Sequence, residues 1–443
     1  MSARPLTPAA FDRLMKPLEP GARLALGVSG GRDSMALAVL VAGWLRWREE
    51  KKLPVPQVFV LSVDHGLRQE AAREARQVGR WMRALGLAHR VLRWEGENPS
   101  ADIQAEARTA RYRLMGEWAA SRGIRDLLLA HHLEDQAETF LMRLQRGSGV
   151  AGLAAMKPVS EREGMRLLRP LLSVPRARLE AVLKAHDQAY IDDPSNEDAG
   201  FLRVKVRKAL PLLEELGLGT ERLVATARHM ARAGEVLEAQ RDALIARAVM
   251  RHPYGFCRID RAAWGKPFEE TGLSAFAQLL RAVSGSVYPP RLEALETAYH
   301  AFLRGKLGKG RTLHGCVIAE DNSAGKKGGA VIWREFAAIA PDIAVLPGKQ
   351  AVWDGRFLLR AEALRSGLEI GPLGQEGLRA LKEAGTALPT GPARKALMAG
   401  PMMRRAGRFF AAPLAGVRAK GASGILCEPI WDAGLRMARE MDV

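Results

Sequence analysis

The sequence predicts an α/β protein: a doubly wound parallel sheet comes first, then an all-α domain and a small α+β domain. Three observations support this fold class. Strand-like and helix-like segments alternate over residues 22–215, helical periodicity dominates residues 220–305, and short segments broken by Pro and Gly end the chain. Alternating strands and helices are typical of a parallel sheet covered on both faces. We expect domains at 1–216, 217–310 and 340–443.

The first part of the chain contains four expected strand–helix pairs. Apolar runs of strand length predict the strands, and apolar positions that recur every three to four residues predict the helices. Gly123 is a stop signal for the third helix. The expected strands cover residues 22–29, 55–65, 88–94 and 125–132, and the expected helices cover 34–50, 69–86, 100–122 and 134–144.

The remainder of this domain is less regular. Residues 146–164 are rich in glycine and predict a loop, and 167–186 predict an edge strand and a helix. The polar turn residues of 191–200 predict a second loop. Residues 201–217 then resume as a helix with Pro211 near a break.

The net charge is strongly positive. The chain has 443 residues, with 67 Lys and Arg against 49 Asp and Glu, which gives a formal charge of +18. Up to Glu215 there are 34 basic and 27 acidic residues, an excess of 7; beyond it there are 33 and 22, an excess of 11. An excess carried by both halves favours a folded surface for nucleic acid over a basic tail. An ordinary solvated Arg-rich surface is the alternative that charge alone leaves open.

Cysteine usage and hydropathy exclude several classes. Cys257, Cys316 and Cys427 form no C-x-x-C pair, so we expect no disulfide framework, no zinc site and no iron–sulfur cluster. No run of about 18 apolar residues predicts a membrane span. The N-terminal segment has no apolar core of the secretory type. We therefore expect a soluble, cytoplasmic protein without membrane contact.

The sharpest motif is GVSGGRDS at residues 27–34, where a strand ends, a glycine-rich turn follows and a helix begins. Backbone N–H groups in such a turn, together with the helix N-terminus, bind phosphates. The spacing differs from both G-x-x-x-x-G-K-S and G-x-G-x-x-G, which argues against those nucleotide sites. A turn that only caps the helix is the alternative. The candidate phosphate ligands are Ser29, Gly30, Gly31, Arg32 and Ser34, with Asp33 as the candidate Mg²⁺ ligand.

A complete Ser-Gly-Gly-x-Asp-Ser motif after the first strand resembles that of the PP-loop ATP pyrophosphatases. Enzymes of this type use ATP to adenylate a carbonyl oxygen and release pyrophosphate. The resemblance implies an ATP site in this turn, with the ligand at the carboxyl ends of the strands. It also implies that Asp64 and His65, at the end of the second strand, shape the nucleotide pocket.

Four further stretches resemble the tRNA(Ile)-lysidine synthetase family, in the right order. They are VDHGLR at 63–68, AEARTARYRLM at 105–115, the run 130–156 and the run 193–216. The resemblance implies that ATP adenylates the wobble cytidine in the CAU anticodon of an isoleucine tRNA. L-Lysine then displaces AMP. The family usually has Asp at the position of Glu134 and Arg-Asn-Arg at 203–205, where this chain has Arg-Val-Lys.

Charged residues on the expected helices suit the two substrates. Glu134, Asp135 and Glu138 are spaced to lie on neighbouring turns of one helix, and an acidic cluster suits the cationic lysine. Arg108 and Arg111 lie one turn apart and could neutralise the α-phosphate or the leaving group. From spacing alone, both sets are also compatible with solvated helix faces.

The RNA contacts are expected on a basic segment and in the later domains. Arg203, Lys205 and Arg207 suit phosphate contacts that position tRNA, with a solvated helix face as the alternative. Residues 217–310 and 340–443 would hold the rest of the tRNA, and a homodimer is compatible with the sequence. His131 and His132 lie at a strand end, where packed histidines are more common than catalytic ones.

Two other functions are alternatives. One is a different PP-loop enzyme, such as a tRNA thiolase or an amidating synthetase. Cluster-dependent thiolases need cysteine pairs, which the chain lacks, and a glutamine-fed synthetase needs an amidotransferase nucleophile, which we do not find. The other is a non-catalytic RNA-binding protein, against which the intact motif and the acidic helix argue.

Overall fold

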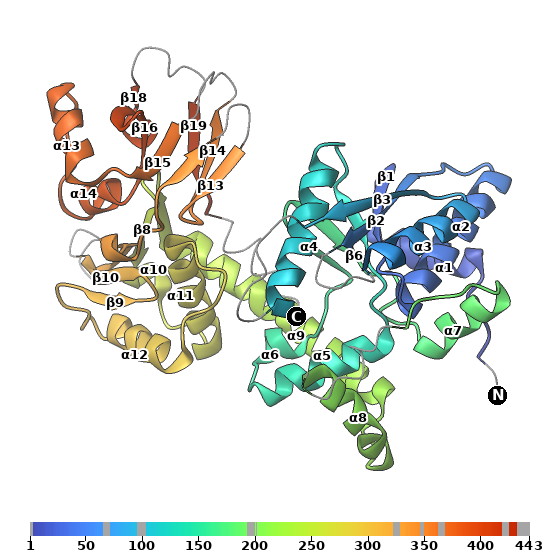
Figure 1. Cartoon of the computed structure of the whole chain (residues 1–443). Helices are drawn as coiled ribbons and strands as arrows, with labels where there is room; N and C mark the ends of the chain where they lie inside the picture. Colours follow the sequence, from blue (N-terminus) through green and yellow to red (C-terminus); the bar gives the residue numbers. More distant parts are fainter. Residues whose placement is uncertain are drawn as a thin grey trace. The chain divides into compact units, whose positions relative to one another are not determined.

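The computed structural model describes residues 3–64, 71–94, 103–192, 200, 202–321, 328–345, 350–361, 368–418 and 425–431. The chain forms two compact units, Met1–Gly234 with the last two residues and Glu235–Met441, called here the N-terminal and C-terminal units (Figure 1). The predicted division into three domains differs from this two-unit organisation and stays a prediction.

The N-terminal unit is built on a six-stranded sheet in the order β3-β2-β1-β4-β6-β5. The chain runs from β1 outward to β3 and then crosses back to β4, so the strand order reverses between β1 and β4. Five strands are parallel, and β5 pairs antiparallel with β6 at one edge. The predicted doubly wound sheet is therefore confirmed. The strands are β1 Arg23–Gly27, β2 Gln57–Asp64, β3 Ala88–Arg93, β4 Asp126–Leu128, β5 Val159–Arg162 and β6 Met165–Leu168.

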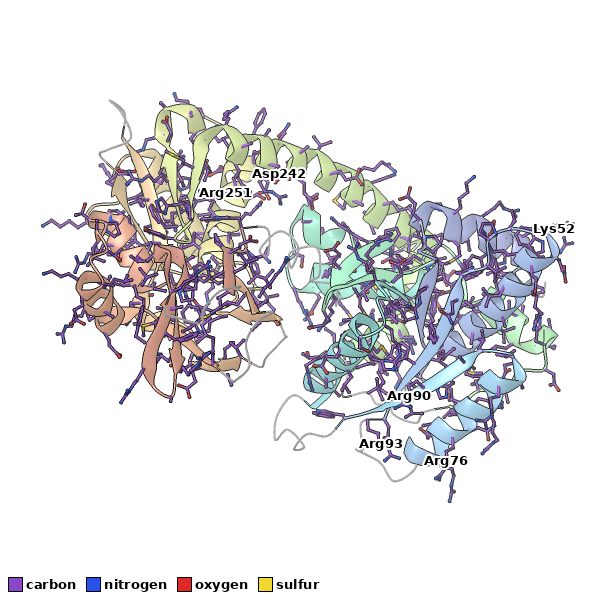
Figure 2. The ribbon with its side chains drawn as sticks, turned by 90° about the horizontal axis from the view of Figure 1, so that it is seen from above. Lys52, Arg76, Arg90, Arg93, Asp242 and Arg251 are labelled. Carbon is purple, nitrogen blue, oxygen red and sulfur yellow. The ribbon has the colours of Figure 1, made fainter. Side chains whose placement is uncertain are left out.

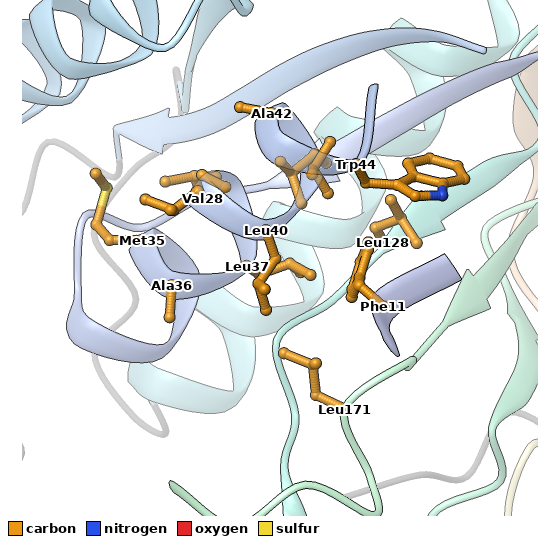
Figure 3. Packing of buried hydrophobic residues seen from close by; sticks show 14 of the residues in the cluster. Phe11, Val28, Met35, Ala36, Leu37, Leu40, Ala42, Trp44, Leu128 and Leu171 are labelled. Carbon is orange, nitrogen blue, oxygen red and sulfur yellow. The ribbon is translucent and has the colours of Figure 1, made fainter. Parts of the chain in front are cut away.

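Helices cover both faces of this sheet. On one face, Phe11 and Trp44 pack edge to face with ring centroids 5.9 Å apart, over Leu128 and Leu171 (Figure 3). On the other face, Tyr112 of α4 belongs to a second buried cluster. The helices are α1 Pro8–Met15, α2 Arg32–Glu50, α3 Ala71–Ala84, α4 Ile103–Ala120, α5 Leu133–Gln145, α6 Val150–Leu153, α7 Arg176–Ala185, α8 Leu202–Glu215 and α9 Thr220–Ala248, which contains the unit boundary.

Three local expectations in this unit are corrected. The predicted loop 146–164 contains α6 and β5, because Arg143 donates hydrogen bonds to the carbonyls of Gly152 and Ala155 and fixes the segment. The strand expected at the sheet edge, β6, lies inside it because β5 pairs outside. Helix α8 continues through Pro211, whose side chain is exposed.

The C-terminal unit first forms a five-stranded antiparallel sheet in the order β7-β8-β11-β10-β9. Segment 217–310, predicted to be all-α, therefore needs one correction: it supplies the hairpin β7–β8. Phe256, Cys257 and Ile259 of β8 are buried, and β8 pairs with a strand some 70 residues later, which local periodicity cannot indicate. The elements are β7 Val249–His252, β8 Phe256–Asp260, α10 Arg261–Trp264, α11 Glu269–Ser284, α12 Leu292–Leu303, β9 Arg311–Leu313, β10 Cys316–Asp321 and β11 Gly329–Arg334.

Two further sheets and two helices complete the C-terminal unit. Their antiparallel strands confirm the predicted α+β character of the last part of the chain. The five-stranded sheet has the order β12-β15-β16-β17-β18, and the three-stranded sheet has the order β13-β14-β19. The elements are β12 Ile343–Val345, β13 Gln350–Trp353, β14 Phe357–Ala361, β15 Leu368–Pro372, α13 Gly374–Glu383, α14 Gly391–Met398, β16 Pro401–Arg405, β17 Arg408–Ala412, β18 Val417–Arg418 and β19 Ile425–Pro429.

All three cysteines are free thiols in the C-terminal unit. Cys257 and Cys316 are fully buried, and Cys427 is half-buried. Burial raises the pKa of Cys257 above its usual range and the pKa values of Cys316 and Cys427 to about 12. Among the helices that the structure describes, none has the length and apolar character needed to cross a membrane.

Basic side chains stand out on the surface of the N-terminal unit. Lys52, Arg76 of α3 and Arg90 and Arg93 of β3 are exposed and point outward (Figure 2). Strand β3 is the edge opposite β5, and charged side chains on an edge strand discourage pairing with another chain.

Candidate active site

The predicted phosphate-binding turn joins β1 to α2 at the carboxyl edge of the sheet. Gly30 has φ 93°, and a Cβ atom there would lie 2.8 Å from Ile191 and 2.9 Å from Val78. A Cβ atom on Gly31 would meet only the Ser29 hydroxyl, at 3.6 Å. Gly30 is thus required by both backbone and packing, whereas Gly31 leaves the N-terminus of α2 open to an anion.

The two serines hold the turn in shape. The Ser34 hydroxyl donates to the Gly31 carbonyl at 2.9 Å and accepts from the Ser29 N–H at 3.2 Å. The Gly31 N–H points to the Ser29 hydroxyl at 3.4 Å. Both hydroxyls therefore support the turn from within, which preorganises its remaining N–H groups.

Asp33, on the first turn of α2, lies beside His132. The His132 Nε2 is 3.4 Å from Asp33 Oδ2 and 3.5 Å from Asp135 Oδ2, and the side chain of His132 is 2% exposed. Burial lowers the pKa of His132, but its hydrogen bonds to Asp33 and Glu134 and the charge of Asp135 raise it to about 10. Burial opposes ionisation of Asp33, yet the hydrogen bond and charge of His132, with the charge of Arg176, hold its pKa below the usual value.

Asp33 fits a magnesium ligand. Its Oδ1 is buried and accepts no hydrogen bond, and its carboxyl group is ionised. Within the described residues there is no group of three or more His, Cys, Asp or Glu that could hold a metal. Mg²⁺ usually binds one or two carboxylates together with substrate phosphates, so a carboxylate oxygen that accepts no hydrogen bond beside a phosphate turn suits it.

Helix α5 carries the predicted acidic cluster, and its three carboxylates have different partners. Glu134 accepts both from the Arg176 N–H, at 3.0 and 3.1 Å, and from His132 at 2.9 Å. Burial opposes ionisation, but these hydrogen bonds hold the pKa of Glu134 below its usual value. Asp135 accepts from the His132 N–H at 3.0 Å and closes a capping box at the start of α5.

Glu138 lies one turn further along α5 and is buried, at 1% exposure. Its carboxylate pairs with Arg203 at 3.1 Å and with Arg207 at 2.8 Å, both from α8. The hydrogen bond to Glu138 raises the pKa of Arg207. Lys205 is exposed. The predicted trio therefore divides into two arginines that face the site and one solvent-facing lysine.

Three arginines surround the ring of Tyr112 at distances below 6 Å. Their guanidinium carbons lie 5.4 Å (Arg108), 5.6 Å (Arg111) and 4.4 Å (Arg162) from the ring centroid. None of the three forms an ion pair with a residue that the structure describes, and the Arg108 Nε is buried without a hydrogen-bond partner. A cluster of guanidinium groups without acidic partners favours anion binding.

Burial and the positive charge of this cluster lower the pKa values of Arg108 and of the neighbouring His131. Burial, with the nearby charges of Arg111 and Arg162, lowers the pKa of Arg108 to about 10. Burial and the charges of Arg169 and Arg108 hold the pKa of His131 well below its usual value, so its imidazole is neutral. A bound anion would relieve both effects.

The site thus brings together most of the residues predicted from the sequence. Asp64 ends β2 in register with Arg93, whereas His65 and the loop 193–199 lie outside the described residues. Sequence reasoning missed Arg176, whose Nε is 3.6 Å from Asp33 Oδ1, and Arg162 and Tyr112 of the arginine cluster. No local signal marks Arg162, because it reaches the site through the β5–β6 hairpin.

Arg32 of the turn forms an ion pair and a cation–π contact. It pairs with Glu180 of α7 at 2.6 Å, and its guanidinium carbon lies 5.1 Å from the ring centroid of Tyr190. Its side chain is therefore turned toward α7, which leaves the N–H groups of the turn as the candidate phosphate donors.

Comparison with known proteins gives consistent matches. Residues 6–213 match the family described as the PP-loop domain. The chain is 37% identical over 399 residues to the tRNA(Ile)-lysidine synthase of Ruegeria pomeroyi, which covers 90% of each protein. It is 35% identical over 337 residues to that of Wolbachia pipientis wMel, covering 76% of each. It is 46% identical over 238 residues to that of a Bradyrhizobium strain, covering 54% of this chain and 65% of the relative.

Proposed function

The chain belongs to the tRNA(Ile)-lysidine synthase family, and from this premise we propose that it ligates L-lysine to the wobble cytidine of an isoleucine tRNA with a CAU anticodon. The reaction forms a carbon–nitrogen bond at C2 of the cytosine. ATP first adenylates the 2-carbonyl oxygen with release of pyrophosphate, and the ε-amine of lysine then displaces AMP. We assign the reaction to the cytoplasm, where tRNA is available.

The observation that carries this proposal is the phosphate turn lying against an acidic helix. The N–H groups of the turn that form no hydrogen bond within it, together with those of the first turn of α2, would bind the ATP phosphates. Asp33, ionised and with one oxygen that accepts no hydrogen bond, would hold Mg²⁺ against them. The metal would neutralise phosphate charge. His132 keeps the carboxylates of Asp33 and Asp135 close together, at 3.4 and 3.5 Å from one nitrogen.

Two carboxylates of α5 would select lysine. Asp135 is 14% exposed at its side chain and can receive an ammonium group, whereas Glu138 is the buried acid one turn away. Together they would orient the ε-amine, and Asp135 would take its proton before attack. Glu134 is bonded to the N-terminus of α7 and to His132, so we assign it to positioning and not to lysine contact.

The cationic side of the site would hold the anions. Arg108, buried and unpaired, would face the α-phosphate and the departing AMP. Arg111 and Arg162, on the same tyrosine ring, would contact the RNA backbone beside the target cytidine. Arg203 and Arg207 stay close to Glu138, and exposed Lys205 remains a candidate phosphate contact.

One experiment tests the function directly. The protein is incubated with ATP, labelled lysine and bulk tRNA, and label is expected in the RNA together with stoichiometric AMP. Asp33→Ala should reduce lysine incorporation by at least about a hundredfold, because the carboxylate that would hold Mg²⁺ against the phosphates is lost. Glu50→Ala, an exposed change on the same helix, is the matched control. Absence of label with the unaltered protein would refute the proposed function.

A further inference from the structure

Arg176 and Asp33 approach each other without forming a hydrogen bond. The Arg176 Nε lies 3.6 Å from Asp33 Oδ1, which is within the range of an ion pair but too long for a hydrogen bond. Both atoms are buried, and neither has a hydrogen-bond partner among the residues that the structure describes. Because unpaired buried polar atoms are costly, each of these two atoms is suited to a further partner.

The backbone of Arg176 is fixed, whereas its side chain has two acidic neighbours. The Arg176 N–H, at the first residue of α7, donates to both oxygens of Glu134 at 3.0 and 3.1 Å. Its Nε lies 4.0 Å from Glu180 Oε1, one turn further along α7, and 3.6 Å from Asp33. The guanidinium group is therefore placed between two carboxylates, and it can reach either of them from one backbone position.

Glu180 is able to accept a second donor. It pairs with Arg32 through Oε1 at 2.6 Å, and its 4.0 Å contact with Arg176 involves the same oxygen. The Glu180 Oε2 has no partner within the described part of the chain. The side chain of Glu180 is 47% exposed, so its carboxylate can adjust to a second guanidinium group.

The packing of α7 against α2 holds this arrangement in place. Leu179 and Leu183 of α7 are buried in the same cluster as Leu37 of α2. Arg176 and Glu180 are four residues apart and share the face of α7 that contacts the first turn of α2. Arg176 can therefore change its acidic partner by rotation of its side chain, while both helices stay where they are.

A metal ion on Asp33 would compete with Arg176. Oδ1 is the oxygen that faces Arg176, and it is also the oxygen that accepts no hydrogen bond and suits a metal. A divalent ion there would lie beside a guanidinium group of the same sign, and a single carboxylate is a poor site for Mg²⁺. The phosphates of a nucleotide would add ligands and negative charge, and would thereby shift the competition toward the metal.

We propose that Arg176 competes with the metal for Asp33 and makes tight metal binding depend on the nucleotide. Arg176 neutralises Asp33 until a metal ion arrives together with a triphosphate, and its side chain then pairs with Glu180. The inference rests on the proposed function for the role of Asp33 as metal ligand. It implies that nucleotide and metal bind as a pair, since each strengthens the binding of the other.

The test is the binding of Mn²⁺, used as the probe, to the full-length protein with and without a non-hydrolysable ATP analogue. Electron paramagnetic resonance of the free ion measures the affinity. The unaltered protein should bind Mn²⁺ tightly only with the analogue. Arg176→Gln should tighten Mn²⁺ binding without the analogue about tenfold, a usual size for coupling between two ligands. Arg176→Lys keeps the positive charge and should leave this affinity low.

Two further variants control the measurement. Lys184→Gln removes the same charge from an exposed position of α7 and should change neither affinity. Asp33→Asn, added to Arg176→Gln, should abolish the gain in Mn²⁺ affinity, because the carboxylate for which Arg176 and the metal compete is lost.

Glu180→Gln tests the proposed movement of Arg176. It removes the acid to which Arg176 would turn, so the Mn²⁺ affinity with the analogue should fall severalfold. In the Arg176→Gln protein the same change should have a smaller effect, since no guanidinium group then needs this acid. The loss of the ion pair with Arg32 is common to both proteins and cancels in the comparison.

Two results would overturn the inference. One is an equal Mn²⁺ affinity without the analogue for Arg176→Gln and Lys184→Gln, and the other is a gain in affinity that survives Asp33→Asn. Lysine incorporation by the unaltered protein tests the proposed function separately. Incorporation together with equal Mn²⁺ affinities would refute the inference alone. A difference in Mn²⁺ affinity without any incorporation would support the inference and refute the proposed function.

Discussion

Glu134 is longer by one methylene group than the aspartate that the family usually has at this position. Its carboxylate reaches the first N–H of α7 and the ring of His132 at once, so it joins α5 to α7. The shorter aspartate, usual in the family, would reach less far from the same backbone position. The departure from the usual aspartate is thus compatible with the proposed function, because the carboxylates proposed to contact lysine are those of Asp135 and Glu138.

His131 gives a pH-dependent prediction. Its pKa is lowered in the folded protein, so on acidification the unfolded chain binds a proton at a higher pH than the folded protein does. The free energy of unfolding therefore decreases as the pH falls below about 6.5. The loss approaches about 1.4 kcal/mol per pH unit. We expect the drop in melting temperature between pH 7.5 and 5.5 to be smaller for His131→Asn than for the unaltered protein. Parallel curves for the two proteins would show that His131 is not held neutral.

At the scale of single residues, a sequence motif identifies the site residues that lie within it. It does not identify the residues that tertiary packing brings to the site. Ser29, Gly30 and Asp33 could be predicted as site residues because one short motif carries them all, and the structure places them in and beside one turn. Arg162 and Arg176 come from elements that pack beside the site. Their approach depends on strand pairing and helix packing, which no local pattern records.

At the scale of elements, the pairing of α5 with α8 organises the acidic side of the site. Arg203 and Arg207 are four residues apart and therefore share one face of α8, where both meet Glu138. Val204, at the position usually occupied by Asn, is buried. The helix thus presents two arginines to the site and exposes Lys205 to solvent.

Glu138 and Arg207 form one ion pair, and two variants remove its acidic or its basic partner. Glu138→Gln should raise the KM for lysine about tenfold or more, because a carboxylate near Asp135 is lost. It should also lower the free energy of unfolding by about 1–3 kcal/mol, because two partly exposed arginines lose their partner. Arg207→Ala should cost similar stability but leave the lysine KM unchanged or lower, since the acid becomes less neutralised. Steady-state kinetics and urea unfolding measure both quantities. An equal rise in KM for the two variants would assign Glu138 a purely structural role.

The elements of the N-terminal sheet were predictable because strands and helices alternate at lengths that periodicity detects. Strands β1 to β4 and helices α2 to α5 lie close to their expected positions. The hairpin β7–β8 was missed because it consists of two strands of four or five residues that directly follow the 29-residue helix α9. Its burial comes from β11, far along the chain, so its strand character is a tertiary effect.

At the scale of the whole molecule, basic side chains occur in two kinds of surroundings, paired with acids or exposed to solvent. The N-terminal unit holds the half-buried Arg203 and Arg207 close to its acidic helix, and the C-terminal unit exposes the basic side chains of segment 304–311. Within the C-terminal unit, Asp354 lies between Arg334 and Arg356, at 2.8 and 2.6 Å. A deletion from residue 340, the predicted domain boundary, would therefore leave the buried Arg334 without its acid.

Asp354→Asn should destabilise the C-terminal unit by about 3–5 kcal/mol, because two buried arginines lose their shared charge. Asparagine tolerates the φ of 52° at this position, so the change isolates the charge. The pKa of Asp354 is lowered by Arg334 and Arg356 against the effect of burial, so the contribution persists above pH 3.8 and is lost only in stronger acid. Urea unfolding at pH 7 measures the loss, and unchanged stability would contradict it. ATP affinity serves as the control and should not move.

The buried thiols make the protein suitable for site-specific labelling. With pKa values of about 12 or above, Cys257, Cys316 and Cys427 hold almost no thiolate at neutral pH and react slowly with maleimides. A cysteine introduced at exposed Lys309 would have an ordinary pKa and would react far sooner. A fluorophore could therefore be attached at this position with no need to remove the native cysteines first.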